Sequence, residues 1–245
     1  MPKDLFSKQA EGYAKFRPVY PAELYDFIFA HCQTFDVAWD CATGNGQVAS
    51  ILKDQFKKVK ATDISASQLS HAIHAPNIEY RISSAEETSF YDHSFDLITV
   101  GQAIHWFDFE AFYNEVKRVL KPSGILVFWG YSFFQTEGSL NELIVDFRKV
   151  IAPYWDKRRK LVDQHYASIK TPFNETLIPP MRIKKEISIK MLCEYLRTWS
   201  SVQHFKNING FDPVDGLEAQ INQKWDLNEL ISIEHPVFGK LCKPI

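Results

Sequence analysis

The sequence predicts a doubly wound α/β fold, in which helices cover both faces of a mostly parallel β-sheet. From residue 37 onward, short apolar runs alternate with segments whose apolar residues recur every three or four positions. This alternation is typical of βαβ units, which build parallel sheets. A turn of small residues at 40–47 follows the first run, and the run at 95–100 is the strongest strand pattern. Such a turn lets a ligand approach the backbone at the start of a helix.

Five strands with four intervening helices fit within residues 36–130, which we expect to form the ligand-binding core. The strands are short apolar runs, predicted at residues 37–39, 58–62, 78–82, 95–100 and 125–129. Helical patterns lie between them, at residues 47–56, in a segment capped by Ser65, and at residues 109–120.

Further elements are expected on both sides of this core. Residues 21–32 and 140–151 each carry an apolar helical stripe. After them we expect a strand at 183–189, a helix at 191–205, and a final strand or hairpin within 228–242. No linker separates these segments, so a single domain is predicted. Its parts are an N-terminal lid and helix (1–35), the core (36–130), an insertion (131–205), and a C-terminal helix and final strand (206–245).

Composition favours a small or neutral ligand. The chain has 245 residues, of which 45% are hydrophobic, and its formal net charge is −2. Nucleic-acid binders concentrate Lys and Arg, so neither nucleic acid nor a membrane is expected as a partner. No apolar run approaches the ~18 residues of a membrane helix, and residues 1–21 lack the apolar core of a secretory signal. We therefore expect a cytoplasmic monomer or homodimer.

The cysteines and histidines predict no metal site. The four cysteines are irregularly spaced and form no C-x-x-C pair, so we interpret them as reduced. His71 and His74 lie three apart on a predicted helix, but no Cys or carboxylate stands beside them at metal-ligand spacing.

The turn at 40–47 is consistent with two kinds of cofactor. Gly44, Gly46 and Ala49 satisfy the dinucleotide pattern G-x-G-x-x-G/A, and Asp63 stands near the expected ribose-binding acid. A dinucleotide would place its pyrophosphate at this turn, close to the Asp40 carboxylate. S-adenosylmethionine carries no phosphate, and both its ammonium and its sulfonium are cationic. Asp40 therefore favours that cofactor, either by contact or by holding the turn in shape.

A short-chain dehydrogenase is a second NAD-dependent alternative, because Tyr166 and Lys170 match its Y-x-x-x-K pair. The glycine pattern of those enzymes, T-G-x-x-x-G-x-G, is not met after Thr43. A pattern with two fixed positions arises readily by chance, so we interpret Tyr166 and Lys170 as surface-helix residues.

Taken in order, these motifs resemble the class I S-adenosylmethionine-dependent methyltransferases, in the methyltransferase type 11 family. The resemblance rests on the turn 40–46, Asp63, the loop 84–86, the strand 95–98 and the segment 121–126. The segments 6–21, 101–107, 153–159 and 195–200 are further similar to the trans-aconitate methyltransferase-like branch. The resemblance implies a Rossmann-like seven-stranded sheet with a helical insertion after strand five. It also implies S-adenosylmethionine as cofactor and S-adenosylhomocysteine as its product. The turn departs from the commoner E/D-x-G-x-G-x-G, since it reads D-x-x-T-G-N-G-Q.

The resemblance and the strand ends together nominate two sets of residues. The cofactor set combines the turn, the strand ends and a lid residue pair four apart: Tyr13, Arg17, Asp40, Ala42, Gly44, Gly46, Asp63, Ile64, Ser84, Ala85, Glu86, Gly101 and Gln102. The substrate set combines aromatic walls with arginines that can pair with a carboxylate: Trp129, Tyr131, Arg148, Trp155, Arg197 and Trp199. Arg159 is a further such arginine. Each arginine alone could equally be a surface ion-pair residue, and Trp129 could belong to the core.

His105 and Trp106 are the candidate catalytic residues, for positioning rather than for acid–base chemistry. Methyl transfer is a displacement that needs alignment and exclusion of water. A carboxylate acceptor arrives ionised and needs no base, whereas a phenol or amine could use His105. The sequence thus predicts a methyltransferase for a small molecule, with an organic acid as the favoured substrate. The alternatives are an RNA or protein methyltransferase, an NAD-linked oxidoreductase and a silent nucleotide-binding module.

Overall fold

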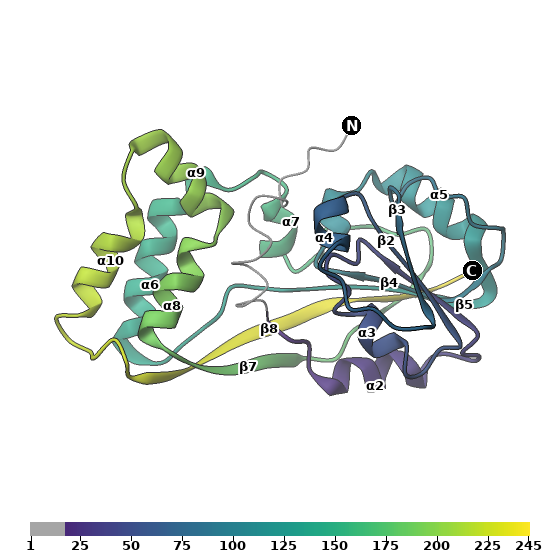
Figure 1. Cartoon of the computed structure of the whole chain (residues 1–245), viewed down its shortest axis with the longest axis horizontal. Helices are drawn as coiled ribbons and strands as arrows, with labels where there is room; N and C mark the ends of the chain where they lie inside the picture. The colour runs from purple at the N-terminus through teal and green to yellow at the C-terminus, as the bar shows by residue number, and fades with distance from the viewer. Residues whose placement is uncertain (1–17) are drawn as a thin grey trace.

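One twisted sheet organises residues 18–245, the part of the chain that the computed structural model describes (Figure 1). The strand order is β3-β2-β1-β4-β5-β8-β6, and β7 also pairs with β8. The strands are β1 (Val37–Cys41), β2 (Lys58–Asp63), β3 (Ile78–Ile82), β4 (Phe95–Gly101), β5 (Leu120–Tyr131), β6 (Asn174–Leu177), β7 (Met181–Ser188) and β8 (Leu230–Lys243). Strands β1 to β5 pair in parallel and β8 runs antiparallel to β5. The predicted mostly parallel α/β sheet is confirmed.

The sheet has eight strands where seven are predicted. The difference arises at its edge, because β6 pairs with the last residues of β8 while β7 pairs with residues 230–237. These two short strands therefore share one position beside β8. Pro179 and Pro180 stand between them. A proline has no backbone N–H to donate to a strand ladder, which explains why the edge is interrupted there.

Helices cover both faces of the sheet, as in a doubly wound fold. On one face, α2 (Ala22–Ala30) and α3 (Ala49–Leu52) pack on side chains such as Ala38 and Leu97. On the other face, α5 (Phe109–Val119) packs on Trp39 and Ile98. Successive residues of a strand point to opposite faces, so each neighbouring pair supplies one residue to each core.

A helical layer lies beyond the end of this sheet, to the left in Figure 1. It is built from α6 (Gly138–Ile151), α8 (Ile189–Arg197), α9 (Ser200–Asn209) and α10 (Pro213–Ile221). The extended ends of β7 and β8 reach into it, and their Ile187 and Ile233 join its apolar core. The short helix α7 (Arg159–Asp163) lies between the helical layer and the sheet.

Three predicted helices differ in the structure. The helix expected at 47–56 is regular only over α3, with turns on either side. No helix joins β3 to β4; residues 83–94 form turns and loop instead. The helix expected at 191–205 is two helices, because the chain is extended at Trp199 (ψ 136°). Thr198 donates to the Tyr195 carbonyl, and such local side-chain bonds compete with helix continuation.

Within residues 18–245, no helix has the length and apolar character needed to span a bilayer.

Candidate cofactor and substrate site

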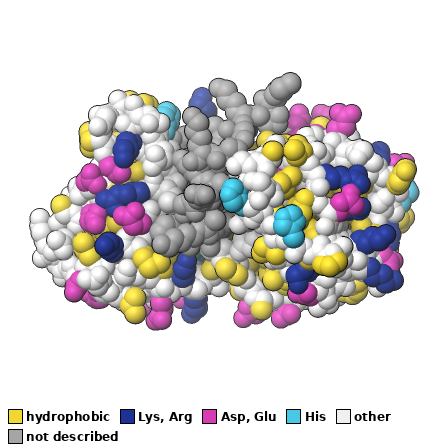
Figure 2. Space-filling model, viewed as in Figure 1, with side chains coloured by type: hydrophobic (Ala, Val, Ile, Leu, Met, Phe, Trp, Pro, Cys, Tyr) yellow, Lys and Arg dark blue, Asp and Glu magenta, His cyan; other side chains and the backbone are white. Residues whose placement is uncertain are grey.

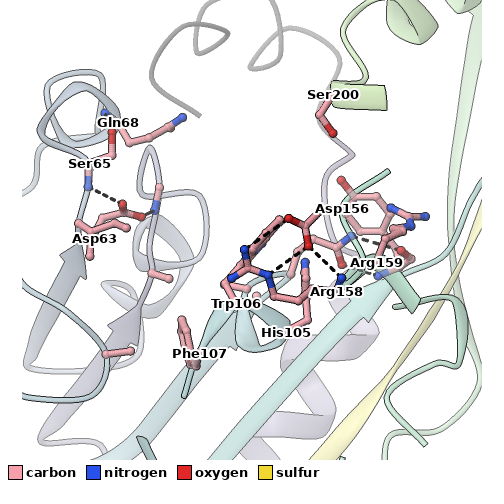
Figure 3. Close-up of a pocket in the computed structure, with 18 of the residues that line it drawn as sticks. Asp63, Ser65, Gln68, His105, Trp106, Phe107, Asp156, Arg158, Arg159 and Ser200 are labelled. Atoms are coloured by element: carbon pink, nitrogen blue, oxygen red, sulfur yellow. Dashed lines mark hydrogen bonds and ion pairs between the residues drawn. The ribbon is translucent and has the colours of Figure 1, made fainter. Parts of the chain in front are cut away.

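A cavity of about 280 Å³ lies between the carboxyl ends of the parallel strands and the helical layer. Ligands of doubly wound folds bind at this edge, where the strand order reverses. Figure 3 shows Asp63 and Ser65 on one side of the cavity and Asp156, Arg158 and Arg159 on the other. The 3-10 helix η2 (Ile104–Trp106) lies between them and carries His105 and Trp106.

The turn after β1 is shaped by left-handed backbone conformations. Ala42, Gly44 and Gly46 have φ angles of 56°, 58° and 81°. Ala42 and Gly44 line the cavity, whereas Gly46 does not. A Cβ at Gly46 would collide with the Tyr80 hydroxyl, so its glycine is required by packing as well as by backbone conformation.

Asp40 holds this turn and does not line the cavity. It is only 1% exposed, and its Oδ2 accepts hydrogen bonds from the Thr43 hydroxyl and, at 3.0 Å, from the Ala49 backbone nitrogen. Its Oδ1 accepts from the Thr99 hydroxyl at 3.0 Å. Of the two roles considered for Asp40, the structure therefore favours holding the turn in shape.

Asp63 does face the cavity, at the end of β2. Its Oδ2 accepts from the Gly44 backbone nitrogen and its Oδ1 from the Ser65 backbone nitrogen, both at 2.9 Å. A carboxylate has about four acceptor positions. Asp63 therefore places at the cavity wall a carboxylate, the kind of acceptor that ribose hydroxyls need.

The remaining candidates on the cofactor side divide into two groups. Ile64, Ala85, Glu86, Gly101 and Gln102 line the cavity, and Ser84 does not. Gln102 accepts from the Tyr131 nitrogen at 2.9 Å and donates to the Tyr131 carbonyl at 3.3 Å, so its amide clamps β5. Tyr13 and Arg17 lie outside the described residues.

His105 is a buried, neutral imidazole on the cavity wall. It is 7% exposed, and its Nδ1 lies 2.9 Å from the Tyr166 hydroxyl. Burial, followed by the nearby charges of Arg159 and Arg158, lowers the pKa of His105 to about 3. Tyr166 is completely buried, so its interpretation as a surface residue is wrong. Its backbone is left-handed, φ 58°, which turns the side chain away from α7 and into the core.

The substrate-side candidates are also split. Tyr131, Trp155 and Trp199 line the cavity, whereas Trp129 is fully buried in the core. Arg148 stacks 3.7 Å from the centre of the Phe133 ring and faces a second hollow.

Arg197 points away from the cavity. It forms ion pairs with Asp215 at 2.9 Å and with Glu218 at 2.6 Å, both on α10. It is therefore a surface ion-pair residue, the other role considered for it.

Of the arginines nominated for the substrate, Arg159 lines the cavity. Its Nε pairs with Asp163 at 3.1 Å, and its guanidinium lies 4.0 Å from the centre of the Phe133 ring and 4.9 Å from that of Trp155. Within residues 18–245, no hydrogen bond or ion pair engages its terminal amino groups. It thus offers a partly buried cation, 17% exposed, framed by aromatic rings.

Sequence reasoning missed several residues on this side, among them Phe133, Tyr195 and His235. Tyr195 belongs to a segment noted only for its resemblance. His235 lies more than a hundred residues from Ser132, which it contacts, and only the pairing of β8 with β5 brings the two together. No local pattern could have identified it.

Comparisons with known proteins agree with this geometry. Residues 39–128 match the family described as a methyltransferase domain. A Dictyostelium discoideum protein assigned as a methyltransferase is 32% identical over 249 residues, which cover 98% of this chain and 95% of that one. The Saccharomyces cerevisiae protein CRG1, assigned as an S-adenosylmethionine-dependent methyltransferase, is 24% identical over 99% of both chains.

Solved structures share the fold. A protein from Anaeromyxobacter dehalogenans, assigned as a type II methyltransferase, is 26% identical with a TM-score of 0.86, covering 94% of this chain and all, 100%, of that one. A Haemonchus contortus phosphoethanolamine N-methyltransferase in complex with S-adenosylhomocysteine is 19% identical with a TM-score of 0.51, and shows similarity of fold alone.

Proposed function

Because the chain belongs to the methyltransferase family, we propose that it transfers the methyl group of S-adenosylmethionine to a carboxylate of a small organic acid. The observation that carries the choice of acceptor is Arg159, a cation at the cavity wall whose terminal amino groups have no partner within residues 18–245. An arginine guanidinium binds a carboxylate through two parallel hydrogen bonds. A carboxylate acceptor also agrees with the segments that resemble the trans-aconitate methyltransferase-like branch. We include membership of that branch in the proposal.

The cofactor side of the cavity fits S-adenosylmethionine. The Asp63 carboxylate faces the cavity as an acceptor for ribose hydroxyls, and Gly44 allows close approach of a ligand to the turn. Ile64 and Phe107 offer apolar surfaces for a planar base. The cofactor supplies an electrophilic methyl group when bound, and the protein's part is to align the acceptor and exclude water.

The acceptor side fits a small anion better than a macromolecule. Aromatic rings of Phe133, Trp155 and Trp199 pack against one another at 5.1–5.8 Å between centres and wall this part of the cavity. Within the basic run 157–160, Arg158 stacks on Trp106 at 4.5 Å and Arg159 on Phe133, so two of its four cations face the cavity. On the face drawn in Figure 2, Lys and Arg side chains are interspersed with Asp and Glu rather than gathered in a basic patch.

His105 contributes no base in this scheme. A carboxylate acceptor loses no proton, so a neutral imidazole with a lowered pKa suffices to orient it. The aromatic rings that wall the cavity exclude water around the sulfonium. The sulfur becomes neutral as the methyl group leaves, so it needs no counter-charge.

Two experiments test the proposal. A thermal-shift panel should show stabilisation of the full chain by S-adenosylhomocysteine and none by NAD; a ligand at 100 times its Kd adds about 2.7 kcal/mol. A screen of organic acids, phenols, amines, RNA and peptides with labelled cofactor should then yield an alkali-labile methyl ester. A base-stable ether or N-methyl product would reject the carboxylate acceptor, and stabilisation by NAD alone would reject the cofactor.

A further inference from the structure

His235, on β8, is a buried imidazole that lines the substrate side of the cavity. It is 1% exposed, and its ring contacts those of Tyr131, Phe134 and Tyr195 at 5.1, 5.8 and 6.3 Å between centres. Its Nδ1 lies 3.0 Å from the Ser132 backbone carbonyl. These contacts fix the ring in one orientation.

The Ser132 contact also fixes the tautomer of His235. A carbonyl oxygen can only accept, so the Nδ1 must carry the hydrogen. Burial lowers the pKa of His235 to about 4, so the ring is neutral at neutral pH. The Nε2 is then a bare acceptor, and among residues 18–245 it is buried without a hydrogen-bond partner. A buried acceptor left unpaired costs free energy. A ligand that donates a hydrogen bond to it removes that cost and therefore binds more tightly than a ligand without a donor.

His105 has the opposite tautomer. Within residues 18–245, the buried hydroxyl of Tyr166 has only one hydrogen-bond partner, the Nδ1 of His105. If the hydroxyl accepted instead, its own proton would stay buried and unpaired. The favoured arrangement is therefore that the hydroxyl donates to Nδ1 and Nε2 carries the hydrogen. The two histidines of the cavity wall therefore carry different groups at Nε2: His105 a donor and His235 an acceptor.

Arg159 acts electrostatically on both rings. After burial, its positive charge is among the causes that lower the pKa of His105 and of His235. The cation therefore lies within electrostatic range of each imidazole. The substrate side of the cavity thus combines two cations, of which Arg158 is paired with Asp156, with one N–H donor and one bare acceptor.

We propose that His235 is a specificity-determining residue whose Nε2 accepts a hydrogen bond from a hydroxyl group of the substrate. The acceptor molecule is then a hydroxy acid, whose carboxylate pairs with Arg159 and whose hydroxyl pairs with His235. This inference rests on the proposed function and narrows its substrate class. A site that hydrogen-bonds a substrate hydroxyl discriminates strongly against the analogue that lacks it, because the buried acceptor is then left unpaired.

Matched pairs of acids test this inference, with the full chain saturated with S-adenosylhomocysteine. The probes are malate against succinate and citrate against tricarballylate, each pair differing only in one hydroxyl. Calorimetry should show at least one hydroxy acid binding about tenfold or more tightly than its partner. In His235→Phe, which keeps an aromatic ring but removes the acceptor, that preference should disappear. His235→Gln, whose amide oxygen reaches toward the position of Nε2, should restore part of it.

A measurement on the unaltered protein guards against a variant that does not fold. The ¹⁵N spectrum of His235 should show a protonated Nδ1 and an unprotonated Nε2, and the Nε2 resonance should shift when the hydroxy acid is added. Equal binding within both pairs, a preference that persists in His235→Phe, or an unmoved Nε2 resonance would overturn the inference alone. Failure of every acid to bind would overturn the carboxylate acceptor, and the hydroxy acid with it.

Discussion

The backbone nitrogen of Gly44 donates a hydrogen bond of 2.9 Å to the Oδ2 of Asp63, and so ties the turn after β1 to the end of β2. The same carboxylate orders the next segment through the Ser65 nitrogen. One side chain therefore shapes both loops that border the cofactor end of the cavity.

We expect Asp63→Ala to weaken S-adenosylhomocysteine binding by roughly a hundredfold or more, because two charge-assisted hydrogen bonds to the ribose would each be worth about 1.5–3 kcal/mol. Calorimetry measures the loss. Asp54→Ala is the matched control, since Asp54 is an exposed acid that pairs with Lys53 and lies outside the cavity. Undiminished affinity in a folded Asp63→Ala protein would remove Asp63 from the cofactor site.

Much of the sheet could be predicted because buried parallel strands are continuous apolar runs. Strand β4, buried along all of its length, is the clearest case. The sequence also allowed the turn at 40–47 and Asp63 to be predicted as neighbours. Each lies at the end of a strand, and consecutive parallel strands of a βαβ unit bring their carboxyl ends to the same edge of the sheet.

The substrate side could not be predicted to the same degree. The sequence nominates both Arg197 and Arg159, but it does not say which side chain meets carboxylates of α10 and which meets the cavity. Likewise, Trp129 and Trp199 are equally apolar, and only the packing of the sheet puts the first in the core. These outcomes depend on contacts between segments far apart in the chain.

Stability should fall as the pH drops below about 6.5, before carboxylates begin to protonate. The pKa values of His105 and His235 are lowered to about 3 and about 4 in the folded protein, while an unfolded histidine has a pKa of about 6.5. Between these values the unfolded chain binds more protons, so the stability is present above pH 6.5 and is lost as the pH falls. Each histidine contributes a slope of about 1.4 kcal/mol per pH unit in this window.

Urea unfolding between pH 7 and pH 5 measures that slope. In His105→Gln the slope of unfolding free energy against pH should fall by about 1.4 kcal/mol per pH unit, the contribution of one proton. This holds whatever the change in stability at pH 7. A slope equal to that of the unaltered protein would mean that folding does not lower the pKa of His105.

Tyr166→Phe should cost about 1–3 kcal/mol of unfolding free energy, because it leaves the buried Nδ1 of His105 without its donor. Tyr113→Phe is the matched control. Within residues 18–245, the Tyr113 hydroxyl is buried with no hydrogen-bond partner, so its removal should be neutral or stabilising. Equal destabilisation by the two substitutions, in parallel denaturation curves, would mean that the hydrogen bond between Tyr166 and His105 does not stabilise the fold.

Arg197→Met should lower stability and leave the site intact. The guanidinium joins α8 to α10 through Asp215 and Glu218, and it is only 22% exposed, so its loss leaves the two carboxylates without their cation. Hydrogen bonds to charged groups are worth about 1.5–3 kcal/mol, and partial exposure places the expected loss toward the lower end.

Lys149→Met is the control, since its pair with Asp146 is exposed on both sides and should contribute almost nothing. Denaturation gives the stability of each variant, and calorimetry with S-adenosylhomocysteine and then a hydroxy acid gives the two affinities. If Arg197→Met instead weakened acid binding at unchanged stability, the carboxylate would pair with Arg197, and the assignment of that role to Arg159 would fall.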